Sequence, residues 1–242
     1  MSSEKEKTFS KENIDNYLNE LSKVYKKLVG RKFPAEIILI GGAAIIERYG
    51  FREITTDIDA IIYAASAMKQ AINEICDKYE LPSDWLNSDF MKTVSYSEKL
   101  IQYSDFYKEF NQILTVRIVK PEYLVAMKLC SGRRYKHDLS DIVGILNEQK
   151  KKSMPITYEM IDIAIRELYG SWDVVSEHAK ELLTNALNIE DYTKLYEEVD
   201  SNEKNIKEQL QEFRDKHPDK VKSKKANEII DIILNTYDKG KK

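Results

Sequence analysis

Residues 36–42 read EIILIGG, a short apolar run rich in β-branched side chains that ends directly in two glycines. Such a run is typical of a buried strand. Residues 43–49 then favour a helix that Gly50 can terminate. Glycines at such a junction let other groups approach the backbone where the first N–H groups of the helix have no intrahelical partner. The stretch therefore predicts an α/β arrangement in which a strand turns into a helix through Gly41 and Gly42.

Two carboxylates follow at the start of a second predicted strand, residues 58–63. Residues 56–59 read TDID, and the period of two in a strand places the side chains of Asp57 and Asp59 on the same side. Unpaired carboxylates at this spacing repel each other, and a divalent ion supported by phosphates relieves the repulsion. We therefore expect these two residues to bind Mg²⁺. The alternative is that Asp57 only caps the strand and Asp59 is an edge residue.

The remaining pattern up to residue 150 predicts one more clear strand, one weaker short strand, and helices around a small mixed sheet. Residues 82–110 show weak periodicity and are expected to be irregular, with one short strand near 93–96. The predicted helices cover residues 14–28, 68–79 and 121–129, another helix begins near His137, and the third strand covers residues 113–119.

After residue 150 the pattern contains helices alone, so we expect two domains. The first, residues 1–150, has an α/β (α+β) fold, and the second, residues 151–242, is a helical C-terminal region. The highly charged segment 201–225 is expected to be a solvated helix face or an exposed arm.

Composition describes an ordinary globular chain with 42% hydrophobic and 33% charged residues. The net charge of −3 argues against a generally basic nucleic-acid binder. Cys76 and Cys130 lie outside any CxxC motif and are expected to be buried thiols in a reducing compartment. The three histidines have no partner at ligand spacing in the sequence. No apolar run approaches the roughly 18 residues of a membrane helix, so we expect no membrane contact and a cytoplasmic protein.

The order strand, Gly-Gly, helix and TDID resembles the DNA polymerase β-like nucleotidyltransferase superfamily. Residues 128–142 read KLCSGRRYKHDLSDI and resemble the helix pair of minimal bacterial nucleotidyltransferases, which include AbiEii-type toxins and DUF6036-like proteins. The likeness covers about residues 35–150. It implies a nucleotidyltransferase-like fold and Mg²⁺-dependent transfer of a nucleoside monophosphate from a nucleoside triphosphate to a tRNA, another RNA or a protein. It also implies the role of a toxin in a toxin–antitoxin pair, with an antitoxin protein as partner.

The same resemblance implies roles for individual residues. Gly41 and Gly42 would cradle the phosphates, while Asp57 and Asp59 would hold the metal and act in catalysis. Lys128 would neutralise the triphosphate as a catalytic residue. Arg133 and Arg134 would add nucleotide contacts, and Asp138 and Asp141 would fix the helix pair, as the resemblance implies. From the residues alone, Lys128 is equally well a surface lysine, and Arg134 with Asp138 an ordinary i, i+4 ion pair.

One departure from the superfamily concerns its third carboxylate, which comes from a later strand and helps to activate the attacking hydroxyl. The corresponding strand here offers Thr115 and Arg117, and Glu122 just beyond it is a substitute. A second hypothesis is therefore an inactive module that binds a nucleotide or a protein partner. A third is a structural partner of another subunit with no nucleotide role.

Overall fold

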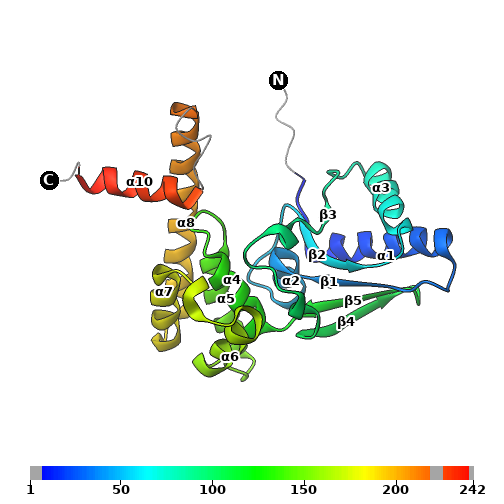
Figure 1. Ribbon diagram of the computed structural model, residues 1–242, viewed down its shortest axis with the longest axis horizontal. Coiled ribbons are helices and arrows are strands. Elements are labelled where there is room, and N and C mark those ends of the chain that lie inside the picture. Colours follow the sequence, from blue (N-terminus) through cyan, green and yellow to red (C-terminus); the bar gives the residue numbers. More distant parts are fainter. Residues whose placement is uncertain (1–6, 219–225, 240–242) are drawn as a thin grey trace. The chain divides into compact units, whose positions relative to one another are not determined.

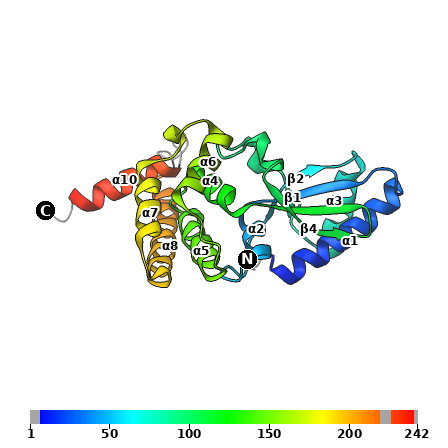
Figure 2. The same ribbon diagram turned by 90° about the horizontal axis from the view of Figure 1, so that it is seen from below.

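The structure is a computed structural model that describes residues 7–218 and 226–239, with side chains in the last segment as far as residue 233 (Figures 1 and 2). The chain forms two compact units. The first comprises Met1–Met127 and Glu159–Trp172, and the second comprises Lys128–Tyr158 and Asp173–Lys242. Each unit is therefore built from two separate stretches of the chain. The predicted division into domains at residue 150 stays a prediction.

The first unit is built on a mixed sheet, as the sequence predicts, and this sheet has five strands. Its order is β3-β2-β1-β5-β4, in which β1 pairs antiparallel with β2 and parallel with β5. Strand β4 is antiparallel to β5, and β3 is parallel to β2. The strands cover Ala35–Leu39 (β1), Ile58–Tyr63 (β2), Leu86–Asn87 (β3), Ser104–Phe110 (β4) and Leu114–Val119 (β5).

The register brings three segments to one edge of this sheet. Strands β1 and β5 are parallel and therefore end at the same edge, where the antiparallel strand β2 begins. The N–H of Ile40 donates to the carbonyl of Asp59 at 3.1 Å, which joins the end of β1 to the start of β2. The helices that follow β1 and β5 also begin here. In open sheets with such connections, ligands bind at this kind of edge.

Helices of the first unit cover the sheet. Helix α1 packs against α3 and lies along one face of the sheet, with its apolar stripe buried (Figures 1 and 2). It begins where the side chain of Asn13 accepts a hydrogen bond from the N–H of Ser10 at 2.8 Å. The helices of this unit are α1 (Lys11–Val29), α2 (Gly41–Arg48), α3 (Ala67–Tyr79), the 3₁₀ helices η1 (Asp89–Lys92) and η2 (Glu98–Ile101), the first turns of α4 (Pro121–Ser131), and α6 (Tyr158–Tyr169) apart from its first residue.

The segment expected to be irregular contains a strand that the sequence pattern hides. Strand β4 was missed because it is a polar edge strand: its one large outward apolar residue, Phe106, is 63% exposed, and a bulge lies between Phe106 and Lys108. A bulge shifts the alternation of side chains and breaks the period of two. The strand predicted at residues 93–96 is wrong, because these residues form a bend and a turn. The hydroxyl of Tyr169 donates to the carbonyl of Ser95 at 2.7 Å and secures this turn.

The second unit is helical. Helix α5 packs against α7 and α8, and α8 packs against α10. Of the two readings of residues 201–225, the solvated helix face is confirmed as far as residue 216, because most side chains there are exposed. The exposed arm is wrong for these residues, because the other face of α8 buries Glu203, Ile206 and Leu210. Residues 219–225 lie outside the described part. The remaining elements are α5 (Asp138–Lys151), the 3₁₀ helix η3 (Trp172–Val174), α7 (Glu177–Asn188), α8 (Tyr192–Lys216) and α10 (Ala226–Lys239).

The two cysteines differ in their burial. Cys130 is buried as expected, but Cys76 is only half-buried, and its thiol donates to the carbonyl of Leu81 at 3.0 Å. Trp85 is fully buried as a packing anchor and contacts the rings of Phe9 and Tyr17. Among the described residues, no helix has the length and apolar character needed to cross a membrane.

Candidate functional site

Gly41 brings the backbone at the start of α2 into contact with a predicted metal ligand. Its φ of +55° is in the left-handed region that favours glycine. A Cβ at this position would also lie 3.3 Å from Oδ2 of Asp59. The Asp59 carboxylate therefore lies against the first turn of α2, where helix N–H groups lack intrahelical partners.

Gly42 is required for a different reason. A Cβ built on it would lie 2.5 Å from Oγ1 of Thr55 and 3.0 Å from Nη2 of Arg52, so any side chain there would displace one of them. Sequence reasoning missed both residues, because polar residues just ahead of a strand look like an ordinary loop. In the sequence, these two residues are marked only by their position between Gly41-Gly42 and the TDID motif at residues 56–59.

Asp57 and Asp59 have the positions that the sequence predicts. Asp57 directly precedes β2, Asp59 lies on it, and both are half-buried. Carboxylate oxygens are the donors that Mg²⁺ prefers, so these two residues fit such an ion by the chemistry of their donor atoms. Within residues 7–218 and 226–233, neither belongs to a group of three metal-ligating side chains with closely spaced ligand atoms.

An arginine occupies β5, the strand that corresponds to the source of the superfamily's third carboxylate. Arg117 and Ile61 both pair with Ile38, so their side chains lie on one face of the sheet, and the period of two adds Asp59 to it. The Nε of Arg117 donates to Oγ of Ser104 at 2.8 Å. Glu122, the proposed substitute, lies half-buried in the first turn of α4, which begins at the same edge as α2.

Lys128, on α4, is part of a buried ionic network in the second unit. Its Nζ lies 2.9 Å from Oδ1 of Asp138 and 2.8 Å from Oδ2 of Asp141, and the lysine is 8% exposed. Arg133 Nε lies 2.8 Å from the other oxygen of Asp138. Burial alone would raise the pKa of Asp138, but the charges and hydrogen bonds of Lys128 and Arg133 hold it well below its ordinary value. Asp138 and Asp141 thus join α4 to α5, as the resemblance implies, and Lys128 is not a surface lysine.

One expectation about neighbouring charges is wrong, and one histidine has a partner that its sequence neighbours do not show. Arg134 does not pair with Asp138 but with Asp231 on α10, at 2.8 Å. His137 has a partner, since its Nδ1 lies 3.2 Å from Oδ1 of Asp200. Both partners are far away in the sequence, and short-range spacing could not reveal them.

His137, Asp200 and Glu203 bring their ligand atoms within 4.8 Å of one another. The Asp200 carboxylate already has an ion pair with Lys204 at 2.6 Å. Glu203 accepts hydrogen bonds from the N–H groups of Leu139 and Ser140 at 2.9 and 3.3 Å, and from the Ser140 hydroxyl at 2.5 Å. This group therefore caps the start of α5, and its oxygens are already engaged.

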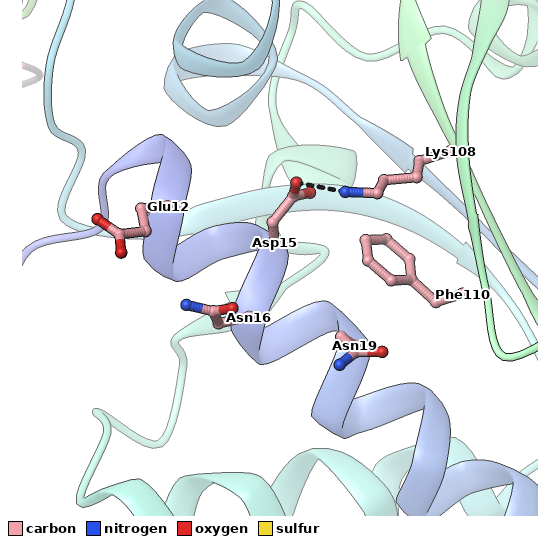
Figure 3. A pocket seen from close by; sticks show the side chains of 6 residues that line it. All are labelled: Glu12, Asp15, Asn16, Asn19, Lys108 and Phe110. Atoms are coloured by element: carbon pink, nitrogen blue, oxygen red, sulfur yellow. Dashed lines mark hydrogen bonds and ion pairs between the residues drawn. The ribbon is translucent and has the colours of Figure 1, made fainter.

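A pocket of about 380 Å³ in the first unit lies between α1 and β4 (Figure 3). The ion pair of Asp15 with Lys108, at 2.7 Å, spans it. None of the predicted site residues contributes to its lining, which consists of Glu12, Asp15, Asn16, Asn19, Lys108 and Phe110. We place the candidate site at the glycine turn instead, because the carboxylate of Asp59 and the open N-terminus of α2 lie together there.

Residues 16–154 match the family described as "Nucleotidyltransferase of unknown function (DUF6036)", which is more than half of the chain. The chain belongs to the DUF6036 family. The predicted family resemblance and fold class are thus confirmed, and the DUF6036 match spans both the glycine turn and the Lys128 network. Comparison of this DUF6036 protein with the curated proteins and with the solved structures gives no match.

Proposed function

We propose that this protein is a Mg²⁺-dependent nucleotidyltransferase. It transfers a nucleoside monophosphate from a nucleoside triphosphate to a hydroxyl of an RNA or protein acceptor and releases pyrophosphate. The observation that carries the proposal is the Asp59 carboxylate against Gly41, at the first turn of α2. This places a metal-type ligand beside a backbone that phosphates can approach closely.

In the proposed reaction, a bond forms between the acceptor oxygen and the α-phosphorus while the bond from that phosphorus to the bridging oxygen of pyrophosphate breaks. The N–H groups of Gly41 and Gly42 face the phosphates and favour their negative charge. Asp57 and Asp59 would hold Mg²⁺, which when bound shields charge on the triphosphate. Glu122 is the carboxylate that we propose to take the proton from the acceptor hydroxyl.

Lys128, Arg133 and Arg134 remain proposed triphosphate ligands on the strength of the family resemblance. For Lys128 and Arg133 the buried carboxylates of Asp138 and Asp141 provide a structural role as well. The two roles differ in what a substitution would change: a structural role affects folding stability, and a phosphate role affects nucleotide affinity.

The acceptor and the biological setting also follow from the resemblance. We propose a cytoplasmic enzyme that modifies tRNA, another RNA or a protein, as the toxin of a pair whose antitoxin is a protein. The net charge of −3 is compatible with a local contact to nucleic acid.

The test is transfer of label from each α-³²P-labelled nucleoside triphosphate, with Mg²⁺, to the total RNA and protein of a cell lysate. Wild type is compared with the double variant Asp57→Ala, Asp59→Ala and with a matched control, Asp77→Ala, Asp84→Ala, which removes two exposed carboxylates. Label should appear with wild type and the control but not with the double variant. Equal labelling by all three would refute the proposed site.

A second candidate function is a module that binds nucleotides without turnover. The observation in its favour is Arg117 on the sheet face of Asp59, in the strand that corresponds to the source of the superfamily's third carboxylate. It predicts calorimetric binding of a nucleoside triphosphate with no label transfer and no pyrophosphate. Pyrophosphate release that is lost in Asp59→Ala would exclude it.

A further inference from the structure

We propose that Thr55 and Arg52 form the subsite for the terminal phosphates of the nucleotide, so that this site selects triphosphates over monophosphates. The inference rests on the proposed function. It assigns two binding residues that neither motif contains, and it gives Gly42 the task of leaving space for them.

The first support is the Thr55 hydroxyl. Its Oγ1 lies 2.5 Å from the place of a Cβ on Gly42. Thr55 is only 4% exposed, and its hydrogen bonds among the described residues are made by its backbone, with Phe9, at 2.7 and 2.8 Å. Its hydroxyl is therefore held firmly beside the first turn of α2 and can serve a ligand.

The second support is the guanidinium of Arg52. Its Nη2 and Cζ lie 3.0 and 3.1 Å from the same Cβ position, and its Nε donates to the carbonyl of Ile54 at 3.1 Å. This hydrogen bond orients the planar group over the glycine backbone. A guanidinium matches the geometry of phosphate oxygens and keeps its charge at any relevant pH.

Side chains of opposite charge lie beside the two glycines. The carboxylate of Asp59 lies against Gly41, and the cation of Arg52 lies against Gly42. A metal-type ligand and a phosphate-type ligand thus flank one open helix N-terminus.

The experiment is calorimetric titration of the full chain, in Mg²⁺, with the four nucleoside triphosphates and then with the diphosphate and monophosphate of the one that binds best. Thr55→Ala and Arg52→Lys should each weaken triphosphate binding roughly ten- to hundredfold, as expected for one hydrogen bond to a charged group. Monophosphate affinity should stay unchanged, as should triphosphate affinity in the control Thr193→Ala, which removes an exposed hydroxyl on α8.

A rescue variant separates phosphate binding from a packing role of Thr55. Gly42→Ser alone should impair binding, because its Cβ would collide with Thr55. Gly42→Ser in the Thr55→Ala background restores a hydroxyl near the lost one and should recover triphosphate selectivity. Failure of this rescue, or equal losses for triphosphate and monophosphate, would overturn the subsite.

The two levels of proposal fail in different ways. If wild type binds none of the four triphosphates, the proposed function and the subsite both fall. If wild type binds a triphosphate and neither Thr55→Ala nor Arg52→Lys changes its affinity, the subsite alone is wrong.

Discussion

Gly41 and Gly42 are chemically identical neighbours, yet the structure requires glycine at each for a separate physical reason. At Gly41 the backbone itself is in the left-handed region, with φ of +55°. At Gly42 neighbouring side chains impose the requirement, because Thr55 and Arg52 approach the backbone too closely for a side chain to fit. Sequence reasoning correctly marked the pair, but the second reason depends on residues that only the folded chain brings there.

Lys128→Ala should destabilise the protein by about 3–5 kcal/mol, the usual range for breaking a buried ion pair. The reason is that Asp138 and Asp141 are buried and would keep charges that Arg133 alone does not balance. Urea denaturation monitored by circular dichroism would measure the change. Lys180→Ala, which removes an exposed ion pair with Glu177, is the control and should change the free energy of unfolding by less than about 1 kcal/mol.

The same variant distinguishes the two roles of Lys128. If Lys128→Ala unfolds at the wild-type urea concentration but binds triphosphate much more weakly, the lysine is a phosphate ligand and the structural account is wrong.

At the scale of elements, α8 provides the cap of α5. Glu203 on α8 accepts hydrogen bonds from N–H groups in the first turn of α5, although it lies more than sixty residues later in the chain. Burial, with a smaller contribution from the nearby Asp141, raises the pKa of Glu203 to about 8, although the Ser140 and Leu139 hydrogen bonds oppose this rise. The contact between the two helices is therefore sensitive to pH.

Stability should fall as pH rises through about 8. The pKa of Glu203 is about 8 in the folded state and 4.5 as its ordinary value, so the folded state binds more protons between these two pH values. This contribution is complete below pH 4.5 and disappears as the pH passes 8. We expect urea denaturation of wild type to give a lower free energy of unfolding at pH 9 than at pH 6.

The control for this prediction is Glu203→Gln, which retains an acceptor oxygen without the charge. It should remove most of the decrease between pH 6 and pH 9, whereas Glu212→Gln, at an exposed site on the same helix, should leave it intact. A decrease of the same size in Glu203→Gln would show that another group is responsible.

The elements recovered from sequence share a strong local signal. The apolar runs of β1 and β2 and the helical stripe of α1 can be recognised in the sequence, because their apolar side chains are buried in the core. Strand β4 had no such signal, since it is polar and bulged at the sheet edge. The site followed the same division: Asp57 and Asp59 were predicted from their spacing. Arg52, Thr55 and Glu203 were missed, because packing between separate segments gives them their positions.

For the whole molecule, the family gives a nucleotidyltransferase-like domain, and its biological role remains our proposal. If the protein is a toxin, its induced expression should slow bacterial growth, and Asp57→Ala should restore the growth rate, because the metal ligand is lost. Growth curves at matched protein levels, checked by immunoblot, provide the measurement. Equal slowing by wild type and Asp57→Ala would speak against a toxin that acts through this site.

The bridge between Phe9 and Thr55 makes a proposed nucleotide ligand depend on the segment that precedes α1. The two residues lie 46 positions apart, and Phe9 is itself fully buried against Tyr17 and Trp85. A fusion or deletion that pulls this segment away would leave every site residue in place in the sequence and still release Thr55. An affinity tag should therefore not disturb the segment that holds Phe9, just before α1. A mutational screen that ranks positions by their sequence distance from the Gly-Gly and TDID motifs would overlook this segment.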